Sequence, residues 1–399
     1  MNPNLDRLHP YPFAKLNSLK QGITPQDKAH IALSIGEPKH ETPSLIHDAL
    51  IKHSEGIAKY PVTKGIPELR IAIKDWISQR FNIASSDISA EDQILPVSGT
   101  REALFSFAQV IVDSSRPDAL VVMPNPFYQI YEGGAILSGA KPYFINTTEE
   151  SNYLPDFDSV ADEIWQRCQL IFICSPGNPT GAVISEQDHI KLIKLAEKFD
   201  FVIASDECYT EIYDDENNPP QGLLETAYNM GNTAFKRCVI FQSLSKRSNA
   251  PGLRSGFVAG DAEILKKYLE YRTYQGCALP FPTQYASTAA WQDEEHVKKN
   301  RVLYRQKFNA FINILEDVCS INKPAASFYI WLKTPISDTD FAQQLFAQQN
   351  ITVLPGSFLS RDAEGINPGK NHIRIALVAP IEECIEAANR IKHFINTLD

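Results

Sequence analysis

The 399-residue chain lacks the features that identify several common classes of protein. None of its apolar stretches reaches the ~18 residues that a membrane-spanning helix requires. The N-terminal segment MNPNLDRLHPYPF is not a basic stretch followed by an apolar one, so it does not resemble a secretory signal. The phosphate loop G-x-x-x-x-G-K-[ST] and the dinucleotide fingerprint G-x-G-x-x-G are both missing. We therefore expect a soluble, cytoplasmic protein without a membrane partner.

Cysteine is scarce and scattered. The seven cysteines are an odd number, and none forms a C-x-x-C pair. This pattern argues against a disulfide framework and against a cysteine zinc site. We expect no metal site, and a reducing compartment suits the free thiols that lie in apolar runs.

Positive charge is not in excess either. The formal net charge is −10, whereas general nucleic-acid binders and proteins of anionic membranes carry a basic surface. No nucleic-acid partner is expected. A content of 43% hydrophobic and 22% charged residues is that of an ordinary folded chain with a large core.

Seven short apolar runs alternate with amphipathic segments through the middle of the chain. Apolar runs without polar alternation are typical of strands buried on both faces, as in a parallel sheet covered by helices. This pattern predicts an α/β fold with a mostly parallel central sheet. The expected strands are Ile94–Val97, Ala119–Met123, Pro142–Ile145, Leu170–Cys174, Val202–Ser205, Val239–Gln242 and Gly256–Ala259, and the clearest helices are Glu102–Val112, Glu186–Phe199 and Ala262–Gln275.

The pattern changes after Trp291, where a charged helix leads into a mixed α+β stretch. We predict a large domain over residues 46–291 and a smaller α+β domain that combines residues 1–45 with residues 292–399. The elements expected in the C-terminal part are a helix at Glu294–Glu316, strands at Phe328–Leu332, Ile351–Leu354 and Ile373–Leu377, a helix at Asp338–Gln349 and a last helix from Ile381.

The first candidate site segment is Ser243-Leu-Ser245-Lys246, directly after a predicted strand. Ligands of open α/β sheets collect at the carboxyl ends of the strands. The two serine hydroxyls and the guanidinium of Arg254, eight residues further on, suit a phosphate group. The Lys246 amine suits imine formation with an aldehyde. Taken alone, the segment is explained equally well as a surface loop.

Two further loops follow predicted strands. Ser98-Gly-Thr100-Arg101 precedes a helix, where free amides and the helix dipole favour an anion, although an ordinary helix cap has the same residues. In Ser175-Pro-Gly-Asn178-Pro-Thr-Gly, proline and glycine predict a sharp turn that aims the Asn178 amide beyond the strand end. A plain surface turn is the alternative.

Asp206 directly follows the predicted strand at 202–205. A buried acid is costly unless a cation or a proton donor meets it, and the protonated nitrogen of an aromatic ring is such a partner. Tyr209 lies three residues on and could donate a hydrogen bond to an oxygen on that ring. A helix-capping aspartate is the ordinary explanation. Together, however, the four motifs supply a phosphate cradle, a ring-oxygen clamp, a ring-nitrogen anchor and an imine-forming lysine.

The motifs Asn-Pro-Thr-Gly at 178–181, Asp-x-x-Tyr at 206–209 and Ser-x-Ser-Lys at 243–246, followed by Arg254, resemble those of the class I and II aminotransferases. These are pyridoxal phosphate (PLP) enzymes of fold type I, and the resemblance extends from Gly36 to the last helix. It implies transamination between amino acids and 2-oxo acids, with Lys246, Asp206 and Tyr209 as catalytic residues. The cofactor-binding residues that it implies are Tyr60, Thr100, Arg101, Tyr128, Asn178, Asp206, Tyr209, Ser243, Ser245, Lys246 and Arg254.

The resemblance also implies substrate contacts and a partner. Arg374, in Asn-His-Ile-Arg-Ile-Ala, matches the arginine that binds the substrate α-carboxylate, and an arginine in an apolar strand is expensive without such a ligand. Gly36 and Asn178 match residues that line the substrate site. Tyr60 matches a tyrosine that reaches the phosphate of the neighbouring subunit, which implies a homodimer.

A narrower resemblance links five segments to the bacterial succinyldiaminopimelate aminotransferases of lysine and diaminopimelate synthesis. It implies exchange of N-succinyl-LL-2,6-diaminopimelate and 2-oxoglutarate with N-succinyl-2-amino-6-oxopimelate and glutamate. Such a substrate needs cations beyond Arg374, and Lys39, Arg247 and Arg272 are candidates, with solvated surface charge as the alternative. The segments are MNPNLDRLHPYPF, SIGEPKH, YPVTKG, PNPFYQIYEGGA and SLSKRSNAPGLRSGFVAGD.

Other functions remain open at this point. Transamination of another N-acylated or aliphatic amino acid, such as N-acetylornithine, would use the same residues. So would a PLP β-lyase, racemase or decarboxylase, because fold does not fix the reaction. A non-catalytic regulator is disfavoured because both Lys246 and Asp206 are present.

Overall fold

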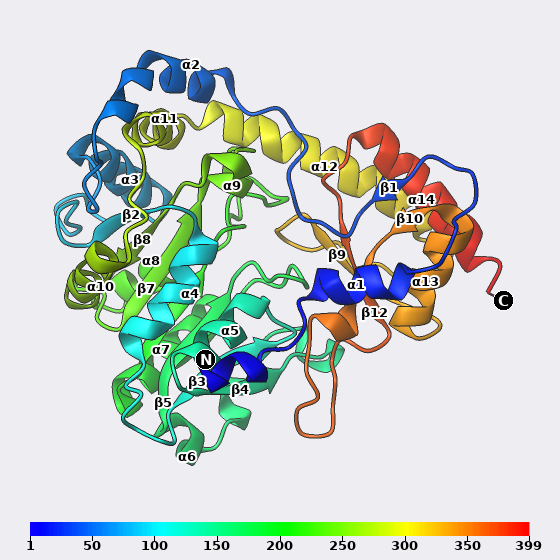
Figure 1. The fold of residues 1–399 in the computed structure, drawn as a ribbon, viewed down its shortest axis with the longest axis horizontal. Coiled ribbons are helices and arrows are strands. Elements are labelled where there is room, and N and C mark those ends of the chain that lie inside the picture. The colour runs from blue at the N-terminus through cyan, green and yellow to red at the C-terminus, as the bar shows by residue number, and fades with distance from the viewer. Residues whose placement is uncertain (399) are drawn as a thin grey trace.

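A seven-stranded sheet forms the centre of the larger part of the computed structural model, which describes residues 1–398 (Figure 1). The strand order is β2-β8-β7-β6-β5-β3-β4. The five strands from β7 to β4 are mutually parallel, and β8 runs antiparallel to both β7 and β2. The predicted mostly parallel sheet is confirmed. Its strands are β2 (Ile94–Val97), β3 (Leu120–Asn125), β4 (Lys141–Asn146), β5 (Cys168–Cys174), β6 (Val202–Asp206), β7 (Cys238–Ser243) and β8 (Gly256–Gly260).

Helices bury both faces of this sheet. Successive side chains of a strand point to opposite faces, so Ile171 and Ile173 of β5 enter one core and Leu170 and Phe172 enter the other. Because both sets are apolar, the strands read as continuous hydrophobic runs. The first core is covered by α2 (Ser44–Lys52), α3 (Pro67–Arg80), α7 (Glu186–Phe199), α8 (Leu223–Asn229) and α11 (Phe281–Gln292), and the second by α4 (Thr100–Ile111), α5 (Gln129–Leu137) and α10 (Ala262–Gln275).

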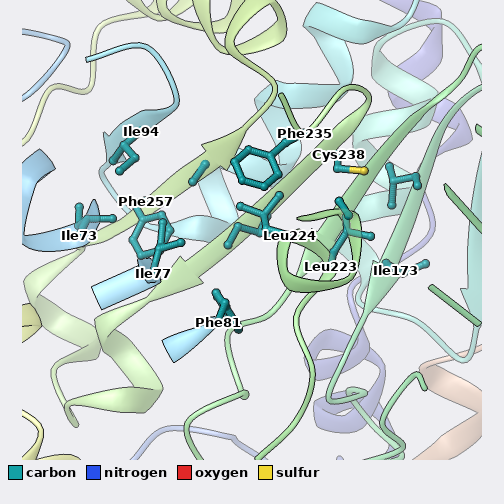
Figure 2. Close-up of a cluster of buried hydrophobic side chains, with 14 of the residues drawn as sticks. Ile73, Ile77, Phe81, Ile94, Ile173, Leu223, Leu224, Phe235, Cys238 and Phe257 are labelled. Carbon is teal, nitrogen blue, oxygen red and sulfur yellow. The ribbon is translucent and has the colours of Figure 1, made fainter. Parts of the chain in front are cut away.

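Figure 2 shows the first core from close by. Ile77 of α3 lies beside Phe257 of β8, and Leu224 of α8 lies near Phe235 and Cys238 at the start of β7. These side chains are fully or almost fully buried. This packing holds β7 and β8 rigidly, and the site segments follow the ends of such strands.

The smaller part contains a three-stranded antiparallel sheet in the order β11-β12-β9 and a two-stranded pair of β1 and β10. The expected single strand at 351–354 is wrong. Val353 separates β10, which pairs with β1, from β11, which pairs with β12, so the chain changes sheets at that residue. The elements are β1 (Ile31–Ala32), β9 (Tyr329–Lys333), β10 (Ile351–Thr352), β11 (Leu354–Pro355), β12 (His372–Ala376), α12 (Glu295–Leu315), α13 (Asp338–Gln349) and α14 (Ile381–Ile395).

The N-terminal segment joins both parts. Its helix α1 (Pro12–Lys20) packs on α13 and β11, whereas the short 3-10 helix at Pro3–Arg7 contacts α5 (Figure 1). Helix α12 runs from the neighbourhood of α11 to α14. Within residues 1–398, every helix is too short or too polar to cross a membrane.

We propose domain boundaries at 46–291 for the large domain and at 1–45 with 292–399 for the small one. The buried residues of the two cores of the seven-stranded sheet run from Ile46 to Trp291. A separate core uses Ile31, Leu33 and residues from 308 to 395. Each domain therefore has its own hydrophobic core, which is what an independently packed domain requires.

Candidate active site

The polar segments after several strands line one cavity of about 390 Å³, a volume typical of sites for small molecules. It collects every residue that the sequence analysis assigned to cofactor or substrate, except Lys39, Tyr60, Arg247 and Arg272. The predicted residues that line it are Gly36, Thr100, Arg101, Tyr128, Asn178, Asp206, Tyr209, Ser243, Ser245, Lys246, Arg254 and Arg374.

Lys246 lies on the one-turn helix α9 (Leu244–Arg247) that starts where β7 ends. The Ser243 hydroxyl caps this turn by accepting a hydrogen bond from the Ser245 amide at 3.1 Å. The Lys246 ammonium donates to the Gly36 carbonyl and lies 5.4 Å from the centre of the Phe328 ring. Burial lowers the pKa of Lys246 to about 8, so near neutral pH an appreciable fraction is the neutral amine that attacks a carbonyl.

Asp206 ends β6 and is almost fully buried. Its carboxylate accepts hydrogen bonds from the Tyr131 hydroxyl at 2.7 Å and from the Cys208 amide at 3.3 Å. Burial nevertheless raises the pKa of Asp206, although these hydrogen bonds and the nearby Lys246 oppose the shift. A carboxylate held in place inside a cavity is suited to meet a protonated ring nitrogen.

The first turn of α4 forms the anion-binding end of the cavity. Gly99 has φ of 94°, and a Cβ at this position would overlap the Arg254 guanidinium. Glycine is therefore required for Arg254 to lie against the start of α4. The Arg254 guanidinium donates to Glu102 at 2.6 Å and to the Pro251 carbonyl at 3.1 Å. The free amides of the helix start and this guanidinium together suit a phosphate.

Arg374 reaches the cavity from β12. Its guanidinium donates to the Asn178 side-chain oxygen at 2.9 Å and to the Ser34 carbonyl at 2.7 Å, and it lies 4.4 Å from the centre of the Tyr329 ring. Its side chain is buried, its Nε has no hydrogen-bond partner, and no carboxylate among residues 1–398 lies within ion-pair distance. A buried guanidinium of this kind is expensive until an anion binds it.

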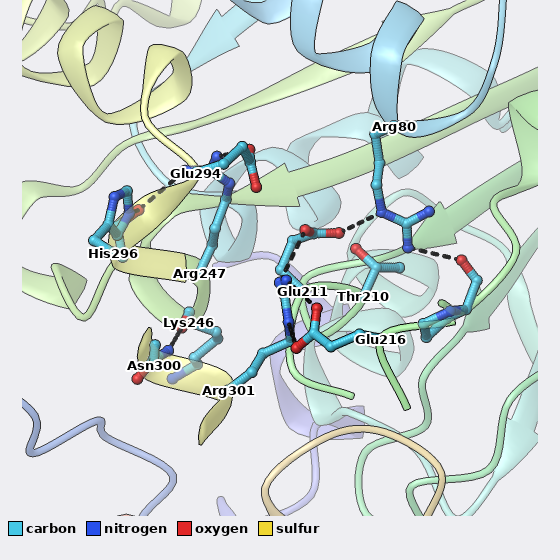
Figure 3. A network of polar contacts seen from close by, with 12 residues as sticks. Arg80, Thr210, Glu211, Glu216, Lys246, Arg247, Glu294, His296, Asn300 and Arg301 are labelled. Atoms are coloured by element: carbon cyan, nitrogen blue, oxygen red, sulfur yellow. Dashed lines mark hydrogen bonds and ion pairs between the residues drawn. The ribbon is translucent and has the colours of Figure 1, made fainter. Parts of the chain in front are cut away.

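Arg247 does not reach the cavity, which corrects the expectation that it binds the distal end of the substrate. Its guanidinium is buried, forms an ion pair with Glu294, donates to the Ala290 carbonyl at 2.7 Å and stacks 4.7 Å from the Trp291 ring (Figure 3). Arg272 is also buried outside the cavity, where it donates to the Cys277 carbonyl at 2.9 Å. Arg272 serves the packing of the large domain, whereas Arg247 also ties that domain to Glu294 at the start of the small one.

Lys39 and Tyr60 lie on the surface of the chain. Lys39 is exposed and pairs with Glu37 at 3.3 Å, so it too does not line the cavity. Tyr60 is completely exposed and contacts no part of this cavity. Its role toward a neighbouring subunit remains a proposal.

Several functional residues were missed by the sequence analysis. Tyr329 lines the cavity with its hydroxyl 3.1 Å from that of Tyr209, and Tyr11 and Phe13 bring the N-terminal segment to the cavity wall. Tyr131 is fully buried, does not line the cavity, and donates a hydrogen bond to Asp206. Arg101 lies 5.4 Å from the centre of the Tyr11 ring.

Comparison with known proteins agrees with this geometry. The family model for aminotransferase class I and II matches residues 28–391. The chain therefore belongs to the class I and II aminotransferases and is a PLP-dependent aminotransferase. The chain is similar to enzymes named LL-diaminopimelate aminotransferase, with 32% identity over 392 residues for that of Aquifex aeolicus and 30% over 393 residues for that of Maridesulfovibrio salexigens, each alignment covering 97% of both chains.

Two solved structures share both sequence and fold with the chain. An aminotransferase from Neisseria meningitidis is 48% identical with a TM-score of 0.94, covering 99% of this chain and 100% of that one. The aminotransferase AspB from Helicobacter pylori is 36% identical with a TM-score of 0.90, covering 98% of this chain and 99% of that one. The fold and the class of reaction expected from the sequence are confirmed.

Proposed function

We propose that the chain transfers the amino group of a diaminopimelate-type amino acid to 2-oxoglutarate, with the N-succinylated form as its specific substrate. The observation that carries the proposal is a buried Arg374 without a carboxylate partner in the same cavity as Lys246. The names of the two relatives described above support a diaminopimelate substrate, and the five sequence segments support the succinylated one.

The residues of the cavity fit PLP. These residues line one cavity. There the Lys246 amine would hold the aldehyde, the Asp206 carboxylate the ring nitrogen, and Arg254 with the first amides of α4 and the Ser243 and Ser245 hydroxyls the phosphate. Asn178 and Tyr209 would bind the ring oxygen, and Tyr128 would cover the ring. Bound PLP supplies an electron sink that makes the Cα proton of the substrate acidic.

The remaining steps belong to the side chains. Arg374 binds the α-carboxylate and so orients the Cα–H bond of the substrate. The Lys246 amine takes the proton from Cα and returns it to the carbon on the other side of the substrate nitrogen, which is the former aldehyde carbon of PLP, acting first as a general base and then as a general acid. Its pKa of about 8 suits both tasks near neutral pH. Asp206 keeps its negative charge opposite the ring nitrogen throughout.

Arg101 is the cation that we assign to the distal end of the substrate, since Lys39, Arg247 and Arg272 do not line the cavity. Its guanidinium is exposed at the cavity wall beside the Tyr11 ring. A guanidinium at this place can bind the terminal carboxylate of a dicarboxylic substrate bidentately, while the apolar surfaces of Tyr11, Phe13 and Ile35 contact its methylene chain.

A substrate panel tests the proposal. kcat/KM is measured with 2-oxoglutarate for N-succinyl-LL-diaminopimelate, LL-diaminopimelate and N-acetylornithine, together with assays for pyruvate and ammonia. We expect the succinylated substrate to lead and glutamate to form in equal amount. Preference for free LL-diaminopimelate would contradict the N-succinylated substrate but keep the assignment to diaminopimelate synthesis. Release of pyruvate and ammonia would indicate a β-lyase instead.

We further propose that the enzyme is a homodimer in which Tyr60 reaches the phosphate site of the partner. Exposed apolar side chains gather along this stretch, at Ile51, Ile57, Tyr60 and Val62, and such a patch is typical of an interface. Light scattering should give twice the chain mass of 44.7 kDa. Tyr60→Ala should weaken PLP binding although Tyr60 is remote from the cavity of its own chain. A monomer in solution would contradict the proposal.

A further inference from the structure

Two tyrosine hydroxyls meet at the wall of the cavity. The Tyr329 hydroxyl of β9 lies 3.1 Å from the Tyr209 hydroxyl, and the two rings are 5.5 Å apart and tilted by 59°. Both side chains are buried, with 2% and 6% of their surface exposed. Water is therefore a poor competitor for this hydrogen bond. The pair joins the smaller domain, which carries Tyr329, to the larger one.

Two neighbours besides Tyr209, namely Arg374 and Gly36, fix the position of Tyr329. The Arg374 guanidinium stacks on its ring, as expected for diagonal neighbours on one face of the antiparallel pair β9–β12, where Ala376 lies opposite Tyr329 and Arg374 lies opposite Trp331. A Cβ at Gly36 would overlap the Tyr329 hydroxyl. The Gly36 carbonyl in turn accepts from Lys246. Tyr329 thus lies between the carboxylate-binding arginine and the lysine.

We propose that Tyr329 is a positioning residue that holds the Tyr209 hydroxyl and strengthens it as a hydrogen-bond donor to the ring oxygen of PLP. This inference rests on the placement of Tyr209 beside that oxygen under the proposed function. A hydroxyl has one proton to donate, so when Tyr209 donates to the ring oxygen its own oxygen accepts the proton of Tyr329. Such chains polarise each successive donor, and the positive charge over the Tyr329 ring acts in the same direction.

The consequence is a coupling between substrate and cofactor. Arg374 contacts Tyr329, Tyr329 contacts Tyr209, and Tyr209 faces the ring oxygen. A hydrogen-bond donor at the ring oxygen stabilises the negative charge on that oxygen. Because this favours the deprotonated form, the lysine-bound cofactor loses its proton at a lower pH. Tyr329 therefore sets part of that pH midpoint without touching the cofactor.

The test is a double-mutant cycle on the holoenzyme, read from the pH dependence of cofactor absorbance. Tyr209→Phe should cause the largest rise in the pH midpoint of the absorbance change. Tyr329→Phe, which keeps the ring under Arg374, should raise it by about half to one pH unit. The double variant should match Tyr209→Phe, because without the Tyr209 hydroxyl there is nothing for Tyr329 to hold.

Tyr304→Phe is the matched control. Tyr304 is a buried tyrosine in the same aromatic cluster, and its hydroxyl has no hydrogen-bond partner among residues 1–398. It should leave the midpoint unchanged. An unchanged midpoint in Tyr329→Phe, or a shift that adds fully to that of Tyr209→Phe, overturns the role of Tyr329. If Tyr209→Phe itself has no effect, the placement of Tyr209 fails as well, while activity of the wild-type enzyme on the substrate panel would still stand.

Discussion

Buried cations are treated differently in two regions of the molecule. In the network of Figure 3, Arg80 donates a hydrogen bond to Glu211 at 2.8 Å, and Arg301 donates two hydrogen bonds to Glu216 at 2.9 and 2.7 Å. In the cavity, Lys246 and Arg374 make their contacts with carbonyl and amide oxygens. Among residues 1–398, neither has a carboxylate within ion-pair distance.

The difference separates charges that serve the fold from charges that serve a ligand. A buried cation is tolerated when its own chain supplies the anion. The network does so with Glu211 and Glu216 and, for Arg247, with Glu294. The cavity leaves Lys246 and Arg374 without anions, at a cost in stability. A substrate carboxylate at Arg374, or the aldehyde of PLP at Lys246, removes that cost. Loss of a network cation should therefore damage the fold, and loss of a cavity cation should damage activity.

The largest expected effect is that of Lys246→Ala. The Lys246 amine both forms the imine and carries the proton, so its removal should lower kcat by about 10⁴-fold or more. The pH-dependent absorbance of the bound cofactor should disappear with it. Both are measured on protein reconstituted with PLP.

Lys307 provides the control for this variant. It is also a buried lysine whose pKa burial lowers to about 8, but it donates to the Val378 carbonyl outside the cavity. Lys307→Met should keep near wild-type turnover. Borohydride reduction of the wild type should fix the cofactor on Lys246, and a reduced adduct found on Lys307 would break the comparison.

Arg80→Met is expected to be the most destabilising change in the network. It leaves the Glu211 carboxylate buried with only the more distant Arg301, 3.9 Å away. Losing one partner of a buried pair costs about 3–5 kcal/mol, measured as a lowered unfolding midpoint in urea. Arg80→Met combined with Glu211→Leu should recover much of this loss because no charge stays buried. kcat/KM of the folded protein should change little.

Arg374→Met should show the opposite behaviour. The unfolding midpoint should stay level or rise, since a buried cation without an anion is removed. kcat/KM should fall by about 10²-fold or more because the bidentate contact with the substrate carboxylate is lost. Steady-state kinetics and urea unfolding of the same preparation decide the matter. A destabilisation as large as that of Arg80→Met would erase the distinction between the two regions.

Much of the large domain could be predicted from the sequence for one physical reason. Strands buried on both faces must be apolar throughout, so β5 and β7 were visible as uninterrupted runs, and the polar motifs directly after them had to meet at the same edge of the sheet. Asp206 and Lys246 were found in this way although 40 residues separate them in sequence.

Other residues depend on information that local sequence does not carry. Arg247 was proposed as a substrate cation because it lies in a segment that resembles the succinyldiaminopimelate enzymes. Neighbouring residues of a helix point about 100° apart, however, and on α9 this turns Arg247 away from Lys246 and toward Trp291. Tyr329 reaches Tyr209 only because β9, of another sheet, packs across the end of the cavity. The division at Val353 likewise follows from which partner each short strand finds.

The smallest expected effect concerns pH and compares cofactor-free proteins. The pKa of Lys246 falls to about 8 from its ordinary 10.5, chiefly through burial, with Arg374 adding a smaller contribution. Between these two values the unfolded chain holds a proton that the folded chain has released, so the stability contributed by this group rises as the pH rises from about 8 to 10.5. Below pH 8 the folded state carries the full cost of a buried ammonium, at most about 3 kcal/mol.

Lys246→Met should therefore unfold at a higher temperature than the wild type at pH 7, and the difference in unfolding temperature should shrink toward pH 10. The exposed Lys39, changed to Met, should give a small difference at both pH values. A gap for Lys246→Met that does not depend on pH would mean that the added stability comes from packing of the methionine, and the cavity lysine would then carry no cost for a ligand to remove.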